Sequence, residues 1–162
     1  MRPALLASVA GLVLVAAGCG AEGDDDGGGD GNAFKAGANR ICRELGVRSA
    51  AVAAPTSPAS YVSYGRETAD VLDDVRRGMA ALELPAGANR GPAQRVVAAF
   101  EAFAPQATKL RSMADAVAAA PADPAATGRA KETLRDVGAV LVRVGDGADP
   151  SFERLGLKAC GG

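Results

Sequence analysis

The chain has 162 residues, of which 18 are lysine or arginine and 19 are aspartate or glutamate, and it contains no histidine. The absence of histidine excludes Ser-His-Asp and Cys-His catalytic arrangements, and it excludes zinc and haem sites built on imidazole. The near balance of charge gives no electrostatic footprint of a nucleic-acid-binding protein. We therefore predict no catalytic residue, no metal site, no cofactor and no nucleic-acid partner.

The first 18 residues have the pattern of a secretory signal. Arg2 gives a positive start, and residues 4–17 are apolar or small except for Ser8. The run ends in Ala16-Ala17-Gly18-Cys19, a small-residue exit typical of signal cleavage. The run is shorter than the ~20 apolar residues that a membrane-spanning helix needs. We therefore predict a removable signal peptide over residues 1–18.

A cysteine directly after these small residues resembles the lipobox of bacterial lipoproteins. This resemblance implies that a diacylglyceryl group is transferred to Cys19, that cleavage occurs before it, and that lipid holds the mature protein on the extracytoplasmic face of a cell membrane. Ala16 stands where the family usually has leucine. The alternative is an ordinary secretory signal cleaved nearby, with Cys19 incidental.

Residues 19–32 are predicted to be a lipidated cysteine followed by a flexible acidic linker. Residues 20–32 read GAEGDDDGGGDGN and contain no apolar side chain larger than alanine. Such a segment cannot bury enough surface to offset the entropy of ordering, and its root-mean-square reach is roughly 20 Å. Counted from Asp24, the fifth and twelfth positions are Gly28 and Lys35, so the acidic run does not match a calcium-binding EF-hand loop.

Residues 33–162 show helical periodicity and form one predicted domain. Apolar residues recur at spacings of three and four, and no stretch alternates with a period of two between turn residues. Four amphipathic helices with short connections favour an all-α, antiparallel up-down four-helix bundle. The predicted helices lie near residues 34–52, 58–84, 92–120 and 124–144.

The predicted boundaries follow proline and glycine. Prolines at 58, 92 and 124 suit first helical turns, whereas those at 85 and 121 disfavour helix in the preceding residue. The fourth helix is predicted to end at residues 145–147, before a short apolar tail at 151–157. The first helix is predicted to be the shortest. Gly65 and Gly138 lie within helical runs and indicate close backbone approach.

The three cysteines suggest one disulfide bond. If Cys19 carries lipid, Cys42 and Cys160 remain, and an exported chain occupies a compartment that permits disulfides. We predict that these two pair and close the bundle, which would stabilise the domain by ~4–5 kcal/mol in the chain-entropy model. The alternative is two free buried thiols.

Pro105 lies inside the third predicted helix. It removes the backbone hydrogen bond to the Glu101 carbonyl and is expected to kink the helix at residues 103–104. The bend either wraps the helix around the bundle or widens the centre enough to admit a ligand. In the second case the candidate pocket residues are Tyr61, Tyr64, Phe100 and Phe103.

The second predicted helix carries a cluster of acids, Asp70, Asp73 and Asp74. Their apolar neighbours define the inner face, so the acids are expected on the solvated face, where Arg66 and Arg77 lie at helical pairing distance. Residues 33–162 hold 17 basic and 14 acidic side chains, a net charge of +3 without a basic cluster. Ion pairs between residues four apart on one helix are also predicted for Arg111 with Asp115 and for Arg40 with Glu44.

The sequence Asn39-Arg40-Ile41-Cys42 early in the domain and Leu155-Gly156-Leu157-x-x-Cys160 at its end, together with the lipobox, resemble small bacterial lipoproteins with an all-helical domain. This resemblance implies no particular activity. We therefore expect a membrane-anchored, non-catalytic interaction module at the cell envelope, with another envelope protein as its partner. A carrier or sensor of a small apolar ligand is the alternative, and an enzyme would need a buried pair of carboxylates.

Overall fold

The computed structural model describes residues 29–161, so the predicted signal peptide and Cys19 lie outside the described residues. Within residues 29–161 the regular structure is entirely helical. One 3₁₀ turn, η1 (Gly87–Asn89), accompanies five α-helices. These are α1 (Gly29–Ala51), α2 (Pro58–Ala80), α3 (Arg90–Glu101), α4 (Phe103–Ala119) and α5 (Pro124–Leu155).

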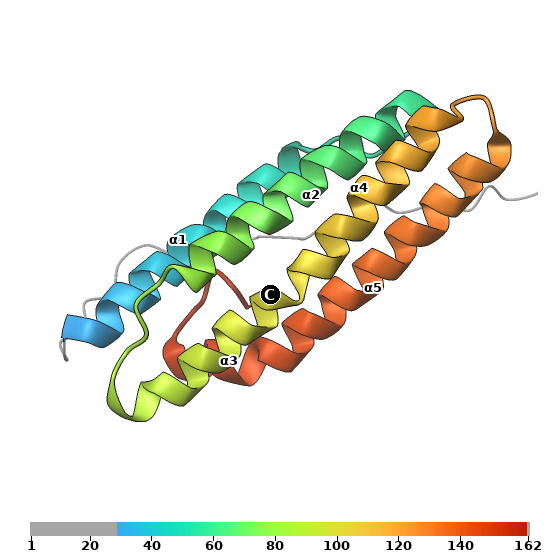
Figure 1. The fold of residues 1–162 in the computed structure, drawn as a ribbon. Helices are drawn as coiled ribbons and strands as arrows, with labels where there is room; N and C mark the ends of the chain where they lie inside the picture. The colour runs from blue at the N-terminus through green and yellow to red at the C-terminus, as the bar shows by residue number, and fades with distance from the viewer. Residues whose placement is uncertain (1–28, 162) are drawn as a thin grey trace, which may run out of the picture.

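The helices form an antiparallel up-down four-helix bundle, which confirms the predicted fold class. α3 and α4 follow one another along α5 and together occupy one position of the bundle (Figure 1). α2 packs between α1 and α4. Gly37 of α1 lies beside Leu82, just after α2, and Gly78 lies beside Ile41, so α1 and α2 run in opposite directions. The Cys42–Cys160 disulfide joins α1 to the tail after α5.

Local sequence explains where α2 and α5 begin and end. Ser57 caps α2 by accepting a hydrogen bond from the Ser60 N–H, and Pro58 occupies the first turn, as predicted. Asp123 caps α5 in the same way, through the Ala125 N–H. α5 ends at Leu155 and is followed by Gly156, whose φ of 64° lies in the left-handed region that glycine adopts without strain.

The fourth predicted helix extends well beyond its expected end, so the prediction that it stops at residues 145–147 was wrong. α5 continues through Gly145, Gly147 and Pro150 to Leu155. The reason is packing: the Phe152 ring lies 6.4 Å from that of Phe100 on α3. Burial of an amphipathic face supplies most helical stability in proteins, and here it offsets the cost of Pro150, about 3 kcal/mol inside a helix.

Three other boundaries differ from prediction. α1 begins at Gly29, inside the predicted linker, and has 23 residues, whereas the shortest α-helix described is α3 with 12. α2 ends at Ala80, short of the Leu84-Pro85 pair. The break between α3 and α4 falls at Ala102, one residue before the predicted kink. Pro105 remains the cause, because its ring and missing N–H disturb the preceding turn.

A glycine at the contact between α2 and α4 allows these two helices to approach closely. Gly65 of α2 faces α4, and a Cβ added there would lie 2.9 Å from the Leu110 carbonyl oxygen and 3.2 Å from the Ala114 Cβ. This confirms the close approach predicted for Gly65. Gly138 is buried in α5.

Replacing Gly65 with alanine is therefore expected to destabilise the bundle by about 1–3 kcal/mol, because α2 and α4 must separate to accept the methyl group. Gly128→Ala is the matched control, since nothing lies within 4 Å of its added Cβ in α5. It should stabilise the protein by about 0.5–1 kcal/mol through helix propensity alone. Urea denaturation measures the free energy of unfolding of both variants. Equal effects of the two substitutions would contradict the close α2–α4 contact.

Candidate interaction surface

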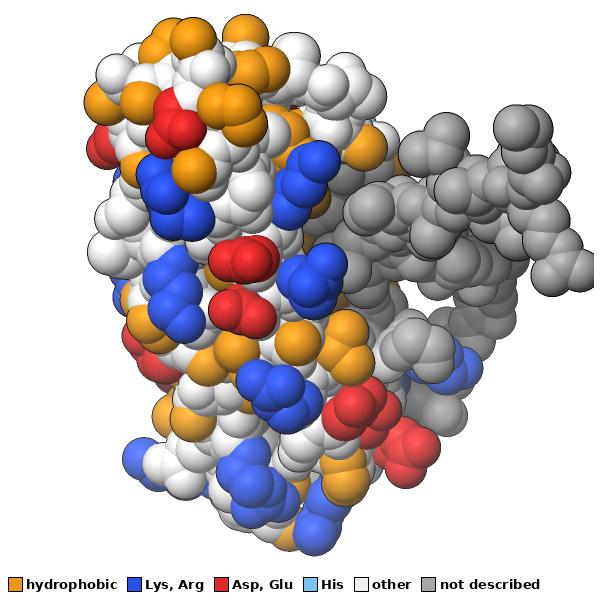
Figure 2. All heavy atoms as spheres, turned by 90° about the vertical axis from the view of Figure 1, so that its right-hand side faces the viewer, with side chains coloured by type: hydrophobic (Ala, Val, Ile, Leu, Met, Phe, Trp, Pro, Cys, Tyr) orange, Lys and Arg blue, Asp and Glu red, His pale blue; other side chains and the backbone are white. Residues whose placement is uncertain are grey.

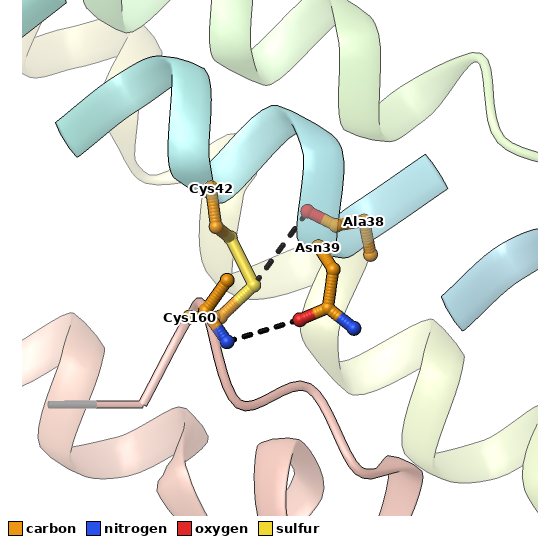
Figure 3. The surroundings of a disulfide bond; sticks show 5 residues. Ala38, Asn39, Cys42 and Cys160 are labelled. Carbon is orange, nitrogen blue, oxygen red and sulfur yellow. Dashed lines mark hydrogen bonds between the residues drawn. A yellow bond between two sulfur atoms is a disulfide. The ribbon is translucent and has the colours of Figure 1, made fainter. Parts of the chain in front are cut away.

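The disulfide predicted between Cys42 and Cys160 is present. The two sulfur atoms are 2.07 Å apart and the Cα atoms 5.2 Å apart, within the usual range for a disulfide. Figure 3 shows the tail lying against α1 at this point. The Asn39 side-chain oxygen accepts a hydrogen bond of 3.0 Å from the Ala159 N–H, and the Cys160 sulfur lies 3.7 Å from the Ala38 carbonyl oxygen. The tail is therefore fixed to α1 by a covalent bond and a hydrogen bond.

The structure separates the four aromatic residues of the predicted pocket. Phe100 and Phe103 pack edge to face across the α3–α4 break, with ring centroids 5.0 Å apart, and both are buried. Tyr61 is also buried, and Tyr64 is half-buried, but both lie in the first two turns of α2. Because α2 is antiparallel to α4, this part of α2 faces the end of α4 away from Phe103. A ligand site among these rings stays a prediction.

The acids of α2 pair mainly with arginines on other helices. Asp70 and Asp73 both bind Arg111 of α4, at 2.8 and 2.7 Å. Asp74 binds Arg48 of α1 at 2.8 Å and also Arg77 of α2. The predicted pairs of Asp70 with Arg66 and of Arg111 with Asp115 were therefore wrong, because helix packing offers closer partners. Arg40 does pair with Glu44, at 2.9 Å.

Two pKa shifts follow from these contacts. The hydrogen bond from Arg48 is the main cause that lowers the pKa of Asp74. Hydrogen bonds to Asp70 and then Asp73 raise the pKa of Arg111. Both favour the charged forms at neutral pH. Asp70 and Asp74 pair with arginines at the surface, where such pairs contribute only about 0–1 kcal/mol each, whereas the Asp73 side chain is only 17% exposed.

Two polar side chains, Gln106 and Ser151, are buried in the described part of the chain. Ser151 of α5 accepts a hydrogen bond from the Arg95 Nε at 3.2 Å. Gln106, in the first turn of α4, is only 5% exposed, and its Oε1 has no hydrogen-bond partner in the described part of the chain. No three histidine, cysteine, aspartate or glutamate residues are grouped there in a way that could hold a metal ion. None of the described helices is long and apolar enough to cross a membrane.

An open groove of about 480 Å³ lies between α4 and α5. Small apolar side chains, Ala116, Ala126 and Ala130, line it together with Met113. Its polar residues are three hydroxyl side chains and three charged ones. They are Thr108, Lys109, Ser112, Arg129, Thr133 and Asp136.

The end of the bundle next to this groove carries little charge. In Figure 2 the top of the molecule, where α4 turns into α5, shows mainly hydrophobic and uncharged side chains. Alanines and prolines at positions 118, 119, 121, 122, 124 and 125 are exposed at this turn. The turn is therefore a weakly charged surface opposite the end where α1 begins, and the neighbouring groove carries three charged side chains.

A second, shallower hollow of about 300 Å³ lies on α1. Arginines surround Val47, whose exposed fraction of 72% is the highest of any large apolar residue described. Neither hollow is lined by any of the four aromatic residues of the predicted pocket.

Sequence reasoning did not single out the α4–α5 groove. The available signal was the outward face of α4, where small residues recur every four positions at Thr108, Ser112 and Ala116. That spacing places them in one row on a helix. The pattern alone does not say which helix lies beside the row, so the groove required the packing of α5.

Comparisons with models of protein families, with curated proteins and with solved structures found no match to this chain. The functional argument therefore rests on the sequence of the chain and on the geometry of its bundle.

Proposed function

We propose that the protein is a membrane-anchored lipoprotein whose helical domain is a non-catalytic interaction module at the cell envelope. The sequence around Cys19 carries this proposal, because a charged start, a short apolar run and small residues before a cysteine resemble a lipobox. The Cys42–Cys160 disulfide supports it, since disulfides persist in oxidising compartments outside the cytosol.

The shape of the bundle also supports this proposal. α1 begins at Gly29, ten residues after the proposed lipid attachment. α5 has 32 residues and is therefore about 48 Å long at 1.5 Å per residue. A protein tethered at the α1 end can present the opposite end, with the α4–α5 turn, away from the lipid. That weakly charged end is the proposed surface for an envelope partner.

The anchor is tested by mass spectrometry of the N-terminal peptide of the protein produced in a bacterium. We expect a peptide that starts at Cys19 and carries the mass of a diacylglyceryl group. Cys19→Ala should lose this mass and release the protein from the membrane fraction, whereas Cys42→Ala should leave both unchanged. An N-terminal peptide that starts elsewhere and carries no lipid would overturn the anchor.

A further inference from the structure

Charged side chains stand on both walls of the α4–α5 groove, with Lys109 on α4 and with Arg129 and Asp136 on α5. The α4 wall covers residues 108–116 and the α5 wall residues 126–136. Because consecutive helices of the bundle are antiparallel, the start of the α4 wall lies beside the end of the α5 wall. Lys109 is therefore across the groove from Asp136.

Of the three charged residues that line the groove, only Arg129 has an ion-pair partner within 4 Å among the described residues, and Lys109 and Asp136 have none. Arg111 binds two acids of α2, Asp115 binds Arg66, and Arg129 binds Asp123 at 3.6 Å. An exposed lysine and an exposed aspartate thus remain on opposite rims of one groove. A partner for both must present a negative and a positive group at the same spacing.

We propose that this partner is a second copy of the chain, and that the groove is the contact surface of a symmetric homodimer. A two-fold axis that runs along the groove places α4 of one copy over α5 of the other. Lys109 of each copy then faces the partner's Asp136, so one contact forms twice, as in isologous interfaces. The small side chains of Ala116, Ala126 and Ala130 allow the helices to approach closely.

The proposed lipid anchor implies that the two copies are parallel, and this one point of the inference rests on the anchor. With the axis along the helices, both α1 ends lie on the same side, and both lipids can enter one membrane. An axis across the helices would make the two copies antiparallel and would pair Arg129 with the partner's Asp136 instead. In that arrangement Lys109 would have no acidic partner.

Charge reversal tests this pairing. The protein used is the chain from residue 20 onward, secreted into an oxidising compartment. Sedimentation velocity over a wide concentration range measures whether it is a monomer or a dimer. We expect a dimer for the unaltered chain and monomers for Lys109→Glu and for Asp136→Lys. A mixture of the two variants should form a dimer again. The glutamate introduced in one variant then faces the lysine introduced in the other, while the native pair forms at the second contact.

Lys131→Glu is the matched control, because Lys131 is exposed on α5 but does not line the groove, so this variant should remain dimeric. Circular dichroism establishes that each variant is folded. A monomeric unaltered chain would overturn the homodimer and leave the groove to a different partner. A dimer that persists in Lys109→Glu, or folded variants that do not associate on mixing, would overturn the parallel pairing. These results do not depend on lipid, so they are separate from a failure of the anchor.

Discussion

Replacing Cys42 and Cys160 together with alanine is expected to lower the free energy of unfolding by about 4–5 kcal/mol. The bond spans a sequence separation of 118 residues, so its loss frees nearly the whole described chain in the unfolded state. Typical domains are stable by only about 5–15 kcal/mol, so this loss is a large share of the total. Many core residues are alanines, which bury little surface each, and this makes the bundle depend more strongly on the bond.

In the folded protein, the same disulfide bond affects mainly α1. This helix packs against α2 and is joined to the tail by the disulfide and by the Asn39–Ala159 hydrogen bond. Without the disulfide, α1 should be the first element to open and should become the first site of limited proteolysis.

Urea denaturation of the secreted chain measures this loss, and the unaltered chain in reducing buffer is the control. It should unfold at the same urea concentration as the double variant, because both lack only the bond. A double variant as stable as the oxidised protein would contradict the prediction. A variant far less stable than the reduced protein would show that the alanine side chains themselves disturb the packing.

Replacing Phe152 with alanine is expected to cost about 3–5 kcal/mol, the usual range for removal of a buried phenylalanine. Phe152 is 4% exposed and packs near Phe100 of α3. Its burial holds the last turns of α5 in place beyond Pro150. The substitution should therefore reduce global stability and also shorten α5, which hydrogen exchange of residues 146–155 can detect.

Val142→Ala is the matched control in the same helix. Its side chain is 56% exposed, so the change in stability should stay within about 0.5 kcal/mol. If Phe152→Ala cost no more than this control, the last turns of α5 would not be packed on α3 as described. The sequence-based prediction of a separate tail would then be correct.

Much of this protein follows from local sequence. The helical spacing of apolar residues, with prolines in first turns, predicted the bundle and the start of α2 and of α5. These signals work because helix formation and capping depend on residues a few positions apart. The Cys42–Cys160 bond was predicted from the count of cysteines and from the proposed export, and the structure confirms it.

Other features depended on contacts between residues far apart in the chain. Two glycines and Pro150 disfavour helix locally, yet burial of Phe152 against α3 continues α5 to Leu155. Asp70 has an arginine four residues before it in its own helix but binds Arg111, 41 residues away. The pair of Asp70 with Arg66 would contribute only about 0.2–0.5 kcal/mol, so a closer partner on another helix prevails. Pro150 alone costs about 3 kcal/mol inside a helix, and burial of a phenylalanine, worth about 3–5 kcal/mol, is large enough to offset it.

The α4–α5 groove also depends partly on local sequence and partly on tertiary packing. The sequence by itself determined that Lys109 and Asp136 lie on separate amphipathic helices, each with a solvent-exposed face. Only the tertiary structure decided that these two faces adjoin and form one groove with a charge on each rim. The physical reason is that helical periodicity specifies which side of a helix is polar, whereas the neighbour of that side is chosen by the packing of the whole bundle.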